Sequence, residues 1–385
     1  MGGADRGQLD HGGQLDHGGQ LDHGDHGDHG DHGDHGDHGA HGDHGAHGDH
    51  GAHGAHGAHG AHGDRSALMQ VMVTGGAGFI GSNLVDRLLA EGHSVAVVDD
   101  LSSGSLANLA DARASSSHAL AFHQLDVRSD ELVEVIGRRR PEVVFHLAAQ
   151  ADVRVSVERP VFDADVNILG TLRVLEGARA AGTARVVFAA SGGTLYGESD
   201  PAELPLKESH PHRPLSPYGV SKMAAIDYLV AYRELHALEF CALALANVYG
   251  PRQDPHGEAG VVAIFADRLL RGEPVTIFGD GEQTRDFVYV DDVVDAFVRA
   301  ATRGGGLVLN IGTGLEVSVS DLARVMGERA GATVAPAHAP ARPGELRRNV
   351  LDPERAGIHL GWQAWTTLGD GVGAVLDHTR RRPAT

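Results

Sequence analysis

Tyr218 and Lys222 lie four residues apart in the segment SPYGVSK, a spacing that suits proton chemistry. On a helix, residues four apart share one face and lie one turn from each other. A phenol with a pKa of about 10 is a poor base at neutral pH, but an adjacent ammonium stabilises its phenolate. Tyr218 could therefore take a proton from an alcohol while a second group takes a hydride. The same spacing is common on surface helices, so the surrounding elements decide its meaning.

A hydroxyl that could assist this pair comes from the segment SGGTLYG. Ser191 directly follows the apolar run Arg185–Ala190, which predicts a strand, and Thr194 stands three residues later. Ser191 is favoured because it begins the loop at the end of the strand, where the ligands of open parallel sheets bind. Thr194 stays an alternative for the same role.

A glycine-rich turn, TGGAGFIGS, stands far upstream of these residues. Gly75, Gly78 and Gly81 follow a predicted strand, Val71–Thr74, and open a predicted helix, Phe79–Ala90. In such a turn one glycine permits the sharp bend, one lets the backbone approach a pyrophosphate, and one allows close packing of helix on strand. The helix N-terminus offers unpaired N–H groups to the phosphates. The turn therefore predicts a dinucleotide site.

Two carboxylates follow the next predicted strands. Asp99 ends the run Ser94–Asp99, 24 residues after Gly75. A carboxylate there accepts hydrogen bonds from the adenosine ribose and repels a 2′-phosphate, which favours NAD over NADP. Asp126 follows the strand-like Ala121–Leu125 and could meet the adenine edge, although a solvated carboxylate at a strand end is the simpler alternative.

Apolar runs and helical patterns alternate through the first half of the chain. Further strands are predicted at Val143–Ala148, Arg185–Ala190 and Cys241–Ala246. Near-continuous apolar strands that alternate with helices indicate a doubly wound parallel sheet, covered on both faces, in the α/β class. We assign residues 69–249 to this Rossmann domain and residues 250–385 mainly to a smaller substrate-binding lobe. Val308–Ile311 is predicted to return to the main sheet.

Residues 1–66 form a low-complexity tail. A glycine falls at every third position from Gly24 to Gly63, and the tail holds 16 of the 27 histidines and 12 of the 52 acidic residues. With so few large apolar residues it cannot offset its ordering entropy, so we expect disorder. A collagen-like helix is disfavoured because the repeat lacks proline. Weak binding of nickel, copper or zinc is plausible, a defined metal site is not expected, and a metal-binding tail module stays open. Met69 stands at a natural start of the domain. An alternative is therefore that the tail is an extension that the cell rarely uses.

Composition excludes several classes of protein. The single cysteine, Cys241, rules out an internal disulfide and fits a reducing compartment. No run of 18 apolar residues is present, which argues against a membrane protein. The acidic balance does not suggest a nucleic-acid surface. We therefore expect a soluble, cytoplasmic protein without a nucleic-acid or membrane partner.

From Met69 to Gly373 the chain resembles the extended short-chain dehydrogenase/reductase family, in its NAD-dependent epimerase/dehydratase branch. Within the branch it is most similar to the UDP-glucose 4-epimerases. The motifs that carry the resemblance are TGGAGFIGS, VVDD, FHLAAQ, SGGTLYG, SPYGVSK, NVYGPRQ and RDFVYVDDV.

The resemblance implies a bound NAD, a UDP-sugar substrate and no metal. It also implies a homodimer that pairs through helices around Val161–Ala180 and Tyr218–His236. The implied catalytic residues are Ser191, Tyr218 and Lys222. The implied cofactor contacts are Gly75, Gly78, Phe79, Ile80, Gly81, Asp99, Asp126, Val127, Ala148, Gln150 and Asn167, with Tyr218 and Lys222. The implied substrate contacts are Ser191, Asn247, Phe278, Arg285 and Arg342.

Three reactions of this branch begin with oxidation at the sugar C4. A 4,6-dehydratase needs a further acid and base, but Gly192 and Gly193 follow Ser191 and neither can transfer a proton. A decarboxylase or a uronate epimerase must bind a C6 carboxylate, and no dedicated extra cation is identified. A 4-epimerase, which interconverts UDP-glucose and UDP-galactose through a 4-keto intermediate, needs the fewest additional catalytic groups and is favoured. The competing hypothesis is that the protein is not an enzyme but an NAD-binding regulator.

Asn349 bears on the choice of sugar. It resembles a position where a large tyrosine restricts the family to unsubstituted hexoses, and a smaller residue would admit a 2-acetamido group. We therefore expect some activity on the N-acetylated pair of sugars.

Overall fold

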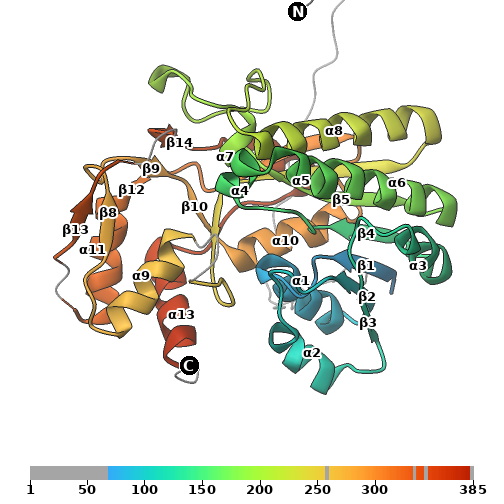
Figure 1. Cartoon of the computed structure of the whole chain (residues 1–385), viewed down its shortest axis with the longest axis horizontal. Coiled ribbons are helices and arrows are strands. Elements are labelled where there is room, and N and C mark those ends of the chain that lie inside the picture. Colours follow the sequence, from blue (N-terminus) through green and yellow to red (C-terminus); the bar gives the residue numbers. More distant parts are fainter. Residues whose placement is uncertain (1–67, 256–259, 333–334, 342–345, 382–385) are drawn as a thin grey trace, which may run out of the picture. The chain divides into compact units, whose positions relative to one another are not determined.

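The computed structural model describes residues 68–255, 260–332, 335–341 and 346–381. Short apolar runs form a seven-stranded parallel sheet in the order β11-β6-β5-β4-β1-β2-β3 (Figure 1). Its strands are β1 (Gln70–Thr74), β2 (Ser94–Asp99), β3 (Leu120–Gln124), β4 (Val143–His146), β5 (Arg185–Ser191), β6 (Glu239–Leu245) and β11 (Leu307–Ile311). The predicted doubly wound sheet is confirmed, as is the return of a late strand to its edge.

Helices cover both faces of this sheet (Figure 1). On one face α1 (Phe79–Ala90) packs against α2 (Ala110–Ser115) and α10 (Val290–Ala300). On the other face α6 (Gly170–Ala181) packs against α3 (Glu131–Arg139) and α8 (Pro217–His236). Leu84 and Leu88 of α1 are buried against the sheet, as the helical period of the sequence predicts.

The chain between β4 and α6 winds irregularly. It forms α4 (Val153–Glu158), α5 (Pro160–Ala164) and a π-helical turn, η2 (Asp165–Leu169), which runs directly into α6. Such turns often mark functional sites because they re-aim a side chain. Here the π turn holds Asn167, which is buried.

The C-terminal part adds a smaller group of helices and strands. Helices α9 (Val261–Leu270), α11 (Val319–Ala330) and α13 (Leu368–Arg381) pack on one another. Three small sheets stand beside them: β7 (Asn247–Tyr249) with β10 (Phe287–Tyr289), β8 (Thr276–Phe278) with β13 (Ala337–Ala339), and β9 (Thr284–Arg285) between β12 (Val317–Ser318) and β14 (Arg348–Asn349). The shorter helices are η1 (Leu106–Leu109), α7 (Gly192–Leu195), η3 (Pro201–Glu203) and α12 (Glu354–Leu360).

Residues 65–385 group by their contacts as one compact unit, in keeping with a lobe that is not cleanly separable. The division at residue 249 stays a prediction. The tail of residues 1–66 lies outside the described residues. Among the described helices, none has the length and apolar character needed to cross a bilayer.

Candidate active site

The glycine-rich turn sits where β1 passes into α1. Gly75 adopts φ +70°, a left-handed conformation that glycine takes at no steric cost, and its N–H donates to the Val98 carbonyl at 2.8 Å. A Cβ on Gly75 would lie 2.7 Å from the backbone nitrogen of Ala148. A Cβ on Gly81 would lie 2.1 Å from the Gly75 carbonyl oxygen. Each position therefore requires the absence of a side chain.

The beginning of α1 suits a phosphate group. Gly78 caps the helix with extended backbone and no side-chain hydrogen bond, which leaves the first N–H groups open to an anion. Phe79 and Ile80 begin the helix and are partly buried against the core. Bare backbone at a helix N-terminus, at the switch point between β1 and β4, fits the pyrophosphate of a dinucleotide.

Asp99 ends β2 beside this turn and is 6% exposed. Its carboxylate accepts hydrogen bonds from the Ala77 N–H at 2.9 Å and the Leu101 N–H at 2.8 Å. Burial raises the pKa of Asp99, and these two backbone donors oppose that rise. The same carboxylate that is expected to read the ribose therefore also holds the glycine turn against β2.

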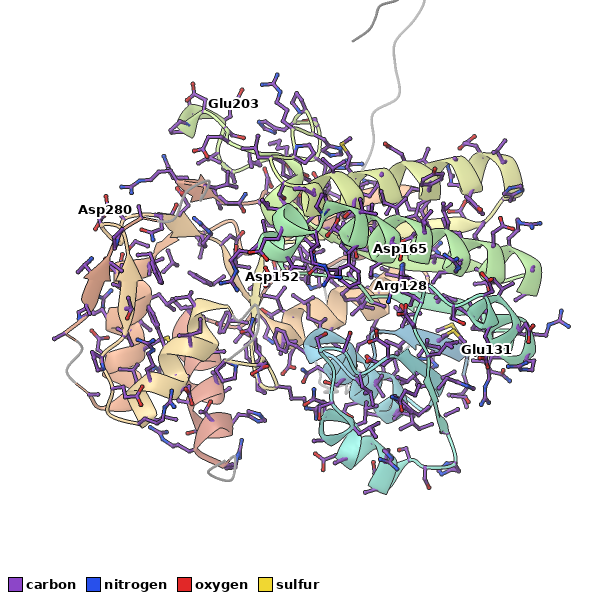
Figure 2. The ribbon with its side chains drawn as sticks, viewed as in Figure 1. Arg128, Glu131, Asp152, Asp165, Glu203 and Asp280 are labelled. Carbon is purple, nitrogen blue, oxygen red and sulfur yellow. The ribbon has the colours of Figure 1, made fainter. Side chains whose placement is uncertain are left out.

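Asp126 is engaged by a neighbour. Arg128 donates to its carboxylate through Nε and Nη2 and also pairs with Asp165 of the π turn at 3.2 Å. Arg128 and Asp165 are labelled in Figure 2. The bond from Arg128 is the main cause that lowers the pKa of Asp126. Val127 is buried and contacts Gly170. An adenine would meet Asp126 as part of an ion pair, not as an isolated carboxylate.

Gln150 and Asn167 bind each other beside the β4 loop. The Asn167 amide oxygen accepts from the Gln150 N–H at 2.9 Å, and its amide nitrogen donates to the Gln150 carbonyl at 2.9 Å. The Gln150 side chain accepts from the Asp152 N–H at 2.6 Å and donates to Asp163 at 3.0 Å. Gln150 thus fixes the loop after Ala148 through both its side chain and its backbone.

Tyr218 lies in the first turn of α8, which begins at Pro217 after the N-cap Ser216. The side chain is half-buried, and desolvation raises its pKa to about 12. A side-chain hydrogen bond with Ser191 opposes that rise. Thr194 turns its hydroxyl to the Ser191 carbonyl at 3.4 Å. Of the two candidate hydroxyls, Ser191 is therefore the one that acts on the pKa of Tyr218.

Lys222 lies one turn further along α8 and is 3% exposed. Its Nζ donates to the Ala189 carbonyl of β5 at 2.9 Å and stands 5.8 Å from the centre of the Tyr218 ring. Burial lowers the pKa of Lys222 to about 8, and the negative charge of Asp163 works against that lowering. The predicted arrangement on one helix face is found, with Ser191 brought to it from the end of β5.

His146 links the glycine turn to the π turn through two threonines. Its Nδ1 lies 2.7 Å from the Thr74 hydroxyl and its Nε2 lies 3.0 Å from the Thr171 hydroxyl. Thr171 donates to the Asn167 carbonyl at 2.6 Å, so its oxygen accepts the Nε2 proton of His146. Burial, assisted by the charge of Lys222, lowers the pKa of His146 to about 3, which keeps the ring neutral.

Two of the expected substrate residues, Asn247 and Arg285, lie next to Asp286. The Asn247 N–H donates to the Asp286 carbonyl at 2.9 Å, and Arg285, the last residue of β9, directly precedes Asp286. The fully buried Asp286 carboxylate accepts from the Thr313 N–H and hydroxyl, at 2.8 and 2.6 Å, and from the Leu351 N–H at 3.3 Å. Asp286 therefore joins its own segment to those of Thr313 and Leu351, which are distant in the chain.

Asn349 stands directly opposite Arg285 in the parallel β14–β9 ladder, so the two side chains share a face. Asn349 is 1% exposed, and neither its Oδ1 nor its Nδ2 has a hydrogen-bond partner among the described residues. Two residues later Leu351 contacts Gly192, beside Ser191. Phe278 ends β8 and is partly buried. The predicted contact Arg342 lies outside the described residues.

Sequence reasoning missed Asp163, His146 and Asp286. Asp163 stands four residues before Asn167, a helical spacing that would have linked the two. His146 and Asp286 carry no local signal, because their partners are far away in the chain. Within the described residues, no group of three or more histidine, cysteine, aspartate or glutamate side chains is placed to hold a metal ion.

The doubly wound sheet brings three features to the carboxyl ends of its strands: a bare glycine turn, a strand-end carboxylate and a Ser–Tyr–Lys group. Together they define a dinucleotide-dependent enzyme that acts on an alcohol or a ketone. Comparison with known proteins agrees. Residues 71–312 match the model of the NAD dependent epimerase/dehydratase family. The chain belongs to this family.

Its similar relatives include a UDP-glucose 4-epimerase of Mycolicibacterium smegmatis, 50% identical over 82% of this chain and 99% of that protein. Among solved structures, the UDP-glucose 4-epimerase of Thermotoga maritima with UDP-glucose is 43% identical, with a TM-score of 0.78 over 81% of this chain and 99% of the other. The Thermus thermophilus UDP-glucose 4-epimerase in complex with NAD is also 43% identical, with a TM-score of 0.75 and the same coverage.

Proposed function

We propose that this protein is an NAD-dependent nucleotide-sugar 4-epimerase that interconverts UDP-glucose and UDP-galactose. The observation that carries the proposal is the placement of Tyr218 and the buried Lys222 one turn apart on α8, with the Lys222 Nζ 5.8 Å from the centre of the Tyr218 ring and Ser191 acting to lower the pKa of Tyr218. Retention of all three groups argues against an NAD-binding regulator without catalysis. The 50% identical relative named above supports the choice of sugar nucleotide.

Each residue has a defined task in this reaction. Bound NAD would supply a hydride acceptor that later returns the hydride. Tyr218, as a phenolate, takes the proton of the sugar C4 hydroxyl and gives it back after the keto sugar has turned over. Ser191 favours the phenolate and can donate to the same sugar oxygen. Lys222 supplies a buried positive charge behind Tyr218.

The loop after Ser191 supports epimerisation over dehydration. Gly192 and Gly193 offer no acid or base for elimination across C5 and C6. A Cβ on Gly193 would meet only the Ser191 hydroxyl, at 3.9 Å, so open space lies beside the catalytic serine. A 4-keto sugar needs such space to present its other face.

Asn349 supports activity on the N-acetylated sugars as well. A buried amide without a hydrogen-bond partner is costly, so a ligand that supplies one gains affinity. The amide shares a face with Arg285, which we assign to the substrate diphosphate together with Asn247 and Arg342. Phe278 is assigned to the uracil. A 2-acetamido group could both fit here and bind the amide.

We also propose a homodimer that forms through α5 and α8. Both helices present large apolar side chains to solvent: Val161 is 82% exposed on α5, and Leu235 is 75% exposed on α8. Sedimentation of the purified protein should give twice the monomer mass.

We also propose a cytoplasmic location. The proposal is based on the lone cysteine, Cys241, which is buried and unpaired.

The test is incubation of purified protein with UDP-glucose, UDP-galactose, UDP-GlcNAc and UDP-glucuronate, without added NAD. Inversion at C4 of the first pair is expected, at a slower rate for UDP-GlcNAc, and none is expected with a Tyr218→Phe control. A stable 4-keto-6-deoxy product would establish a dehydratase instead. Turnover of UDP-glucuronate alone would favour the uronate reactions.

A further inference from the structure

A carboxylate lies buried beside the catalytic helix. Asp163 of α5 is 1% exposed, and α5 packs against α8. Its Oδ1 accepts from the side-chain amides of Gln150 and Asn167, both at 3.0 Å. Its Oδ2 is also buried but has no hydrogen-bond partner among the described residues. A carboxylate in this state is stable as an anion only if a positive charge lies nearby.

Among the described residues, Lys222 is the cation that acts on Asp163, and the two other carboxylates nearby are engaged elsewhere. The Asp152 carboxylate, at the start of α4, is turned to the N–H groups of Arg154 and Val155, and Asp165 of the π turn pairs with Arg128 (Figure 2). Burial raises the pKa of Asp163, and the positive charge of Lys222 on α8 opposes that rise. Asp163 in return raises the pKa of Lys222 against the effect of burial.

Lys222 in turn needs an anion. Its Nζ donates to a neutral acceptor, the Ala189 carbonyl, and lies over the Phe188 ring at 4.7 Å. The titratable groups that face it are His146 from β4, which is neutral, Tyr218 from its own helix, and Asp163 from α5. Asp163 is therefore its anionic neighbour before Tyr218 ionises.

The carboxylate is also joined mechanically to the catalytic turn. Asn167 Nδ2 bridges Asp163 and the Ser221 hydroxyl, at 3.0 and 3.1 Å. Ser221 donates to the Tyr218 carbonyl at 2.9 Å. This chain of bonds fixes where the negative charge stands relative to the first turn of α8.

We propose that Asp163 is the buried counter-charge of Lys222, a positioning residue that keeps the ammonium protonated and sets the pH range in which the Tyr218–Lys222 pair works. The expected effect on the kcat–pH profile rests on the proposed function, whereas the expected effect on the pKa values of Lys222 and Tyr218 does not. A negative charge raises the pKa of an ammonium and of a phenol alike. Its removal should therefore lower the pKa of both Lys222 and Tyr218.

The test is Asp163→Asn in the full-length protein with its bound cofactor. The variant keeps an Oδ1 acceptor for Gln150 and Asn167, removes the charge and replaces Oδ2 with an NH2 group of similar size. Both limbs of the kcat–pH profile should move to lower pH, by about one pH unit. The matched control is Asp165→Asn, which removes the same charge from a partly exposed position on the neighbouring turn and should leave both midpoints in place. A purely structural role would reduce kcat without moving either limb.

A second readout needs no substrate. The ultraviolet absorbance of the phenolate is titrated in the Asp163→Asn and parent proteins, each against its own Tyr218→Phe reference. The Tyr218 transition should move to lower pH in Asp163→Asn even if the proposed sugar substrate is wrong. An unmoved transition would mean that Asp163 is uncharged and would overturn the inference.

A double-mutant cycle covers the case in which Asp163→Asn folds poorly. Each single variant, Asp163→Asn or Lys222→Met, leaves one buried charge without its partner. The double variant removes both, so its thermal unfolding temperature should exceed the value expected from adding the two single losses. Additive losses would show that the two charges are not coupled and would also overturn the inference.

Discussion

Gly81→Ala is the substitution for which the structure gives the sharpest expectation. Gly81 is the third residue of α1, and a Cβ there would lie 2.1 Å from the Gly75 carbonyl oxygen and 2.9 Å from the Gly76 Cα. Carbon and oxygen that are not bonded normally stay about 3.3 Å apart or more. Both obstacles are backbone atoms, so no side chain can turn away and the glycine turn itself must open.

The size of the effect follows from this overlap. Overpacking a core costs about 1–3 kcal/mol when side chains can give way, and backbone gives way less easily, so a cost of about 3 kcal/mol is expected. Expressed as cofactor affinity, this is a loss of about 100-fold. Gly81→Ala should therefore be purified with little NAD, although its chain still folds.

Gly137→Ala is the matched control. Gly137 lies inside α3, and a Cβ there would meet nothing within 4 Å. Alanine stabilises a helix interior by about 1 kcal/mol relative to glycine, so this variant should unfold at the same or a higher temperature. The assay is NAD released per chain on denaturation, together with thermal unfolding of all three proteins. Full NAD content in Gly81→Ala, or equal losses in both variants, would refute the close-approach reasoning.

Three further outcomes are expected. Ser191→Ala should lower kcat by about 100-fold or more through loss of the hydroxyl beside Tyr218, whereas Thr194→Ala should change kcat little, and the reverse order would reassign the role. Parent kcat should fall as pH rises through about 8, because Lys222 then loses the proton that burial already weakens, and the Lys222→Met profile should lack that limb. Asn349→Tyr should abolish turnover of UDP-GlcNAc and spare UDP-glucose, measured as the ratio of the two kcat/KM values; equal turnover of both sugars by the variant would count against the assigned gate.

The surroundings of Arg285 show what a sequence motif leaves undetermined. The sequence segment RDFVYVDDV suggested Arg285 as a substrate contact. The structure adds that the next residue, Asp286, accepts hydrogen bonds from segments that are 27 and 65 residues away along the chain. These contacts could not be predicted, because neither partner segment has a spacing or composition that refers to Asp286.

The sequence alone predicted the features that depend on neighbouring residues. The strand–turn–helix around Gly75 and Gly81, and the helical spacing of Tyr218 and Lys222, depend on backbone geometry within a few residues, so spacing predicts them. The parallel sheet also followed, because continuous apolar strands that alternate with helices have few other ways to be covered.

The tertiary structure decided what depends on segments that are distant in the chain. It placed Ser191 where its hydroxyl acts on the pKa of Tyr218, whereas the Thr194 hydroxyl faces the Ser191 carbonyl. It left the amide of Asn349 buried without a partner, and it placed the carboxylate of Asp163 within the field of Lys222. Burial and electrostatic interactions arise only when separate elements pack together, and for that reason the charges behind the catalytic pair are a property of the fold.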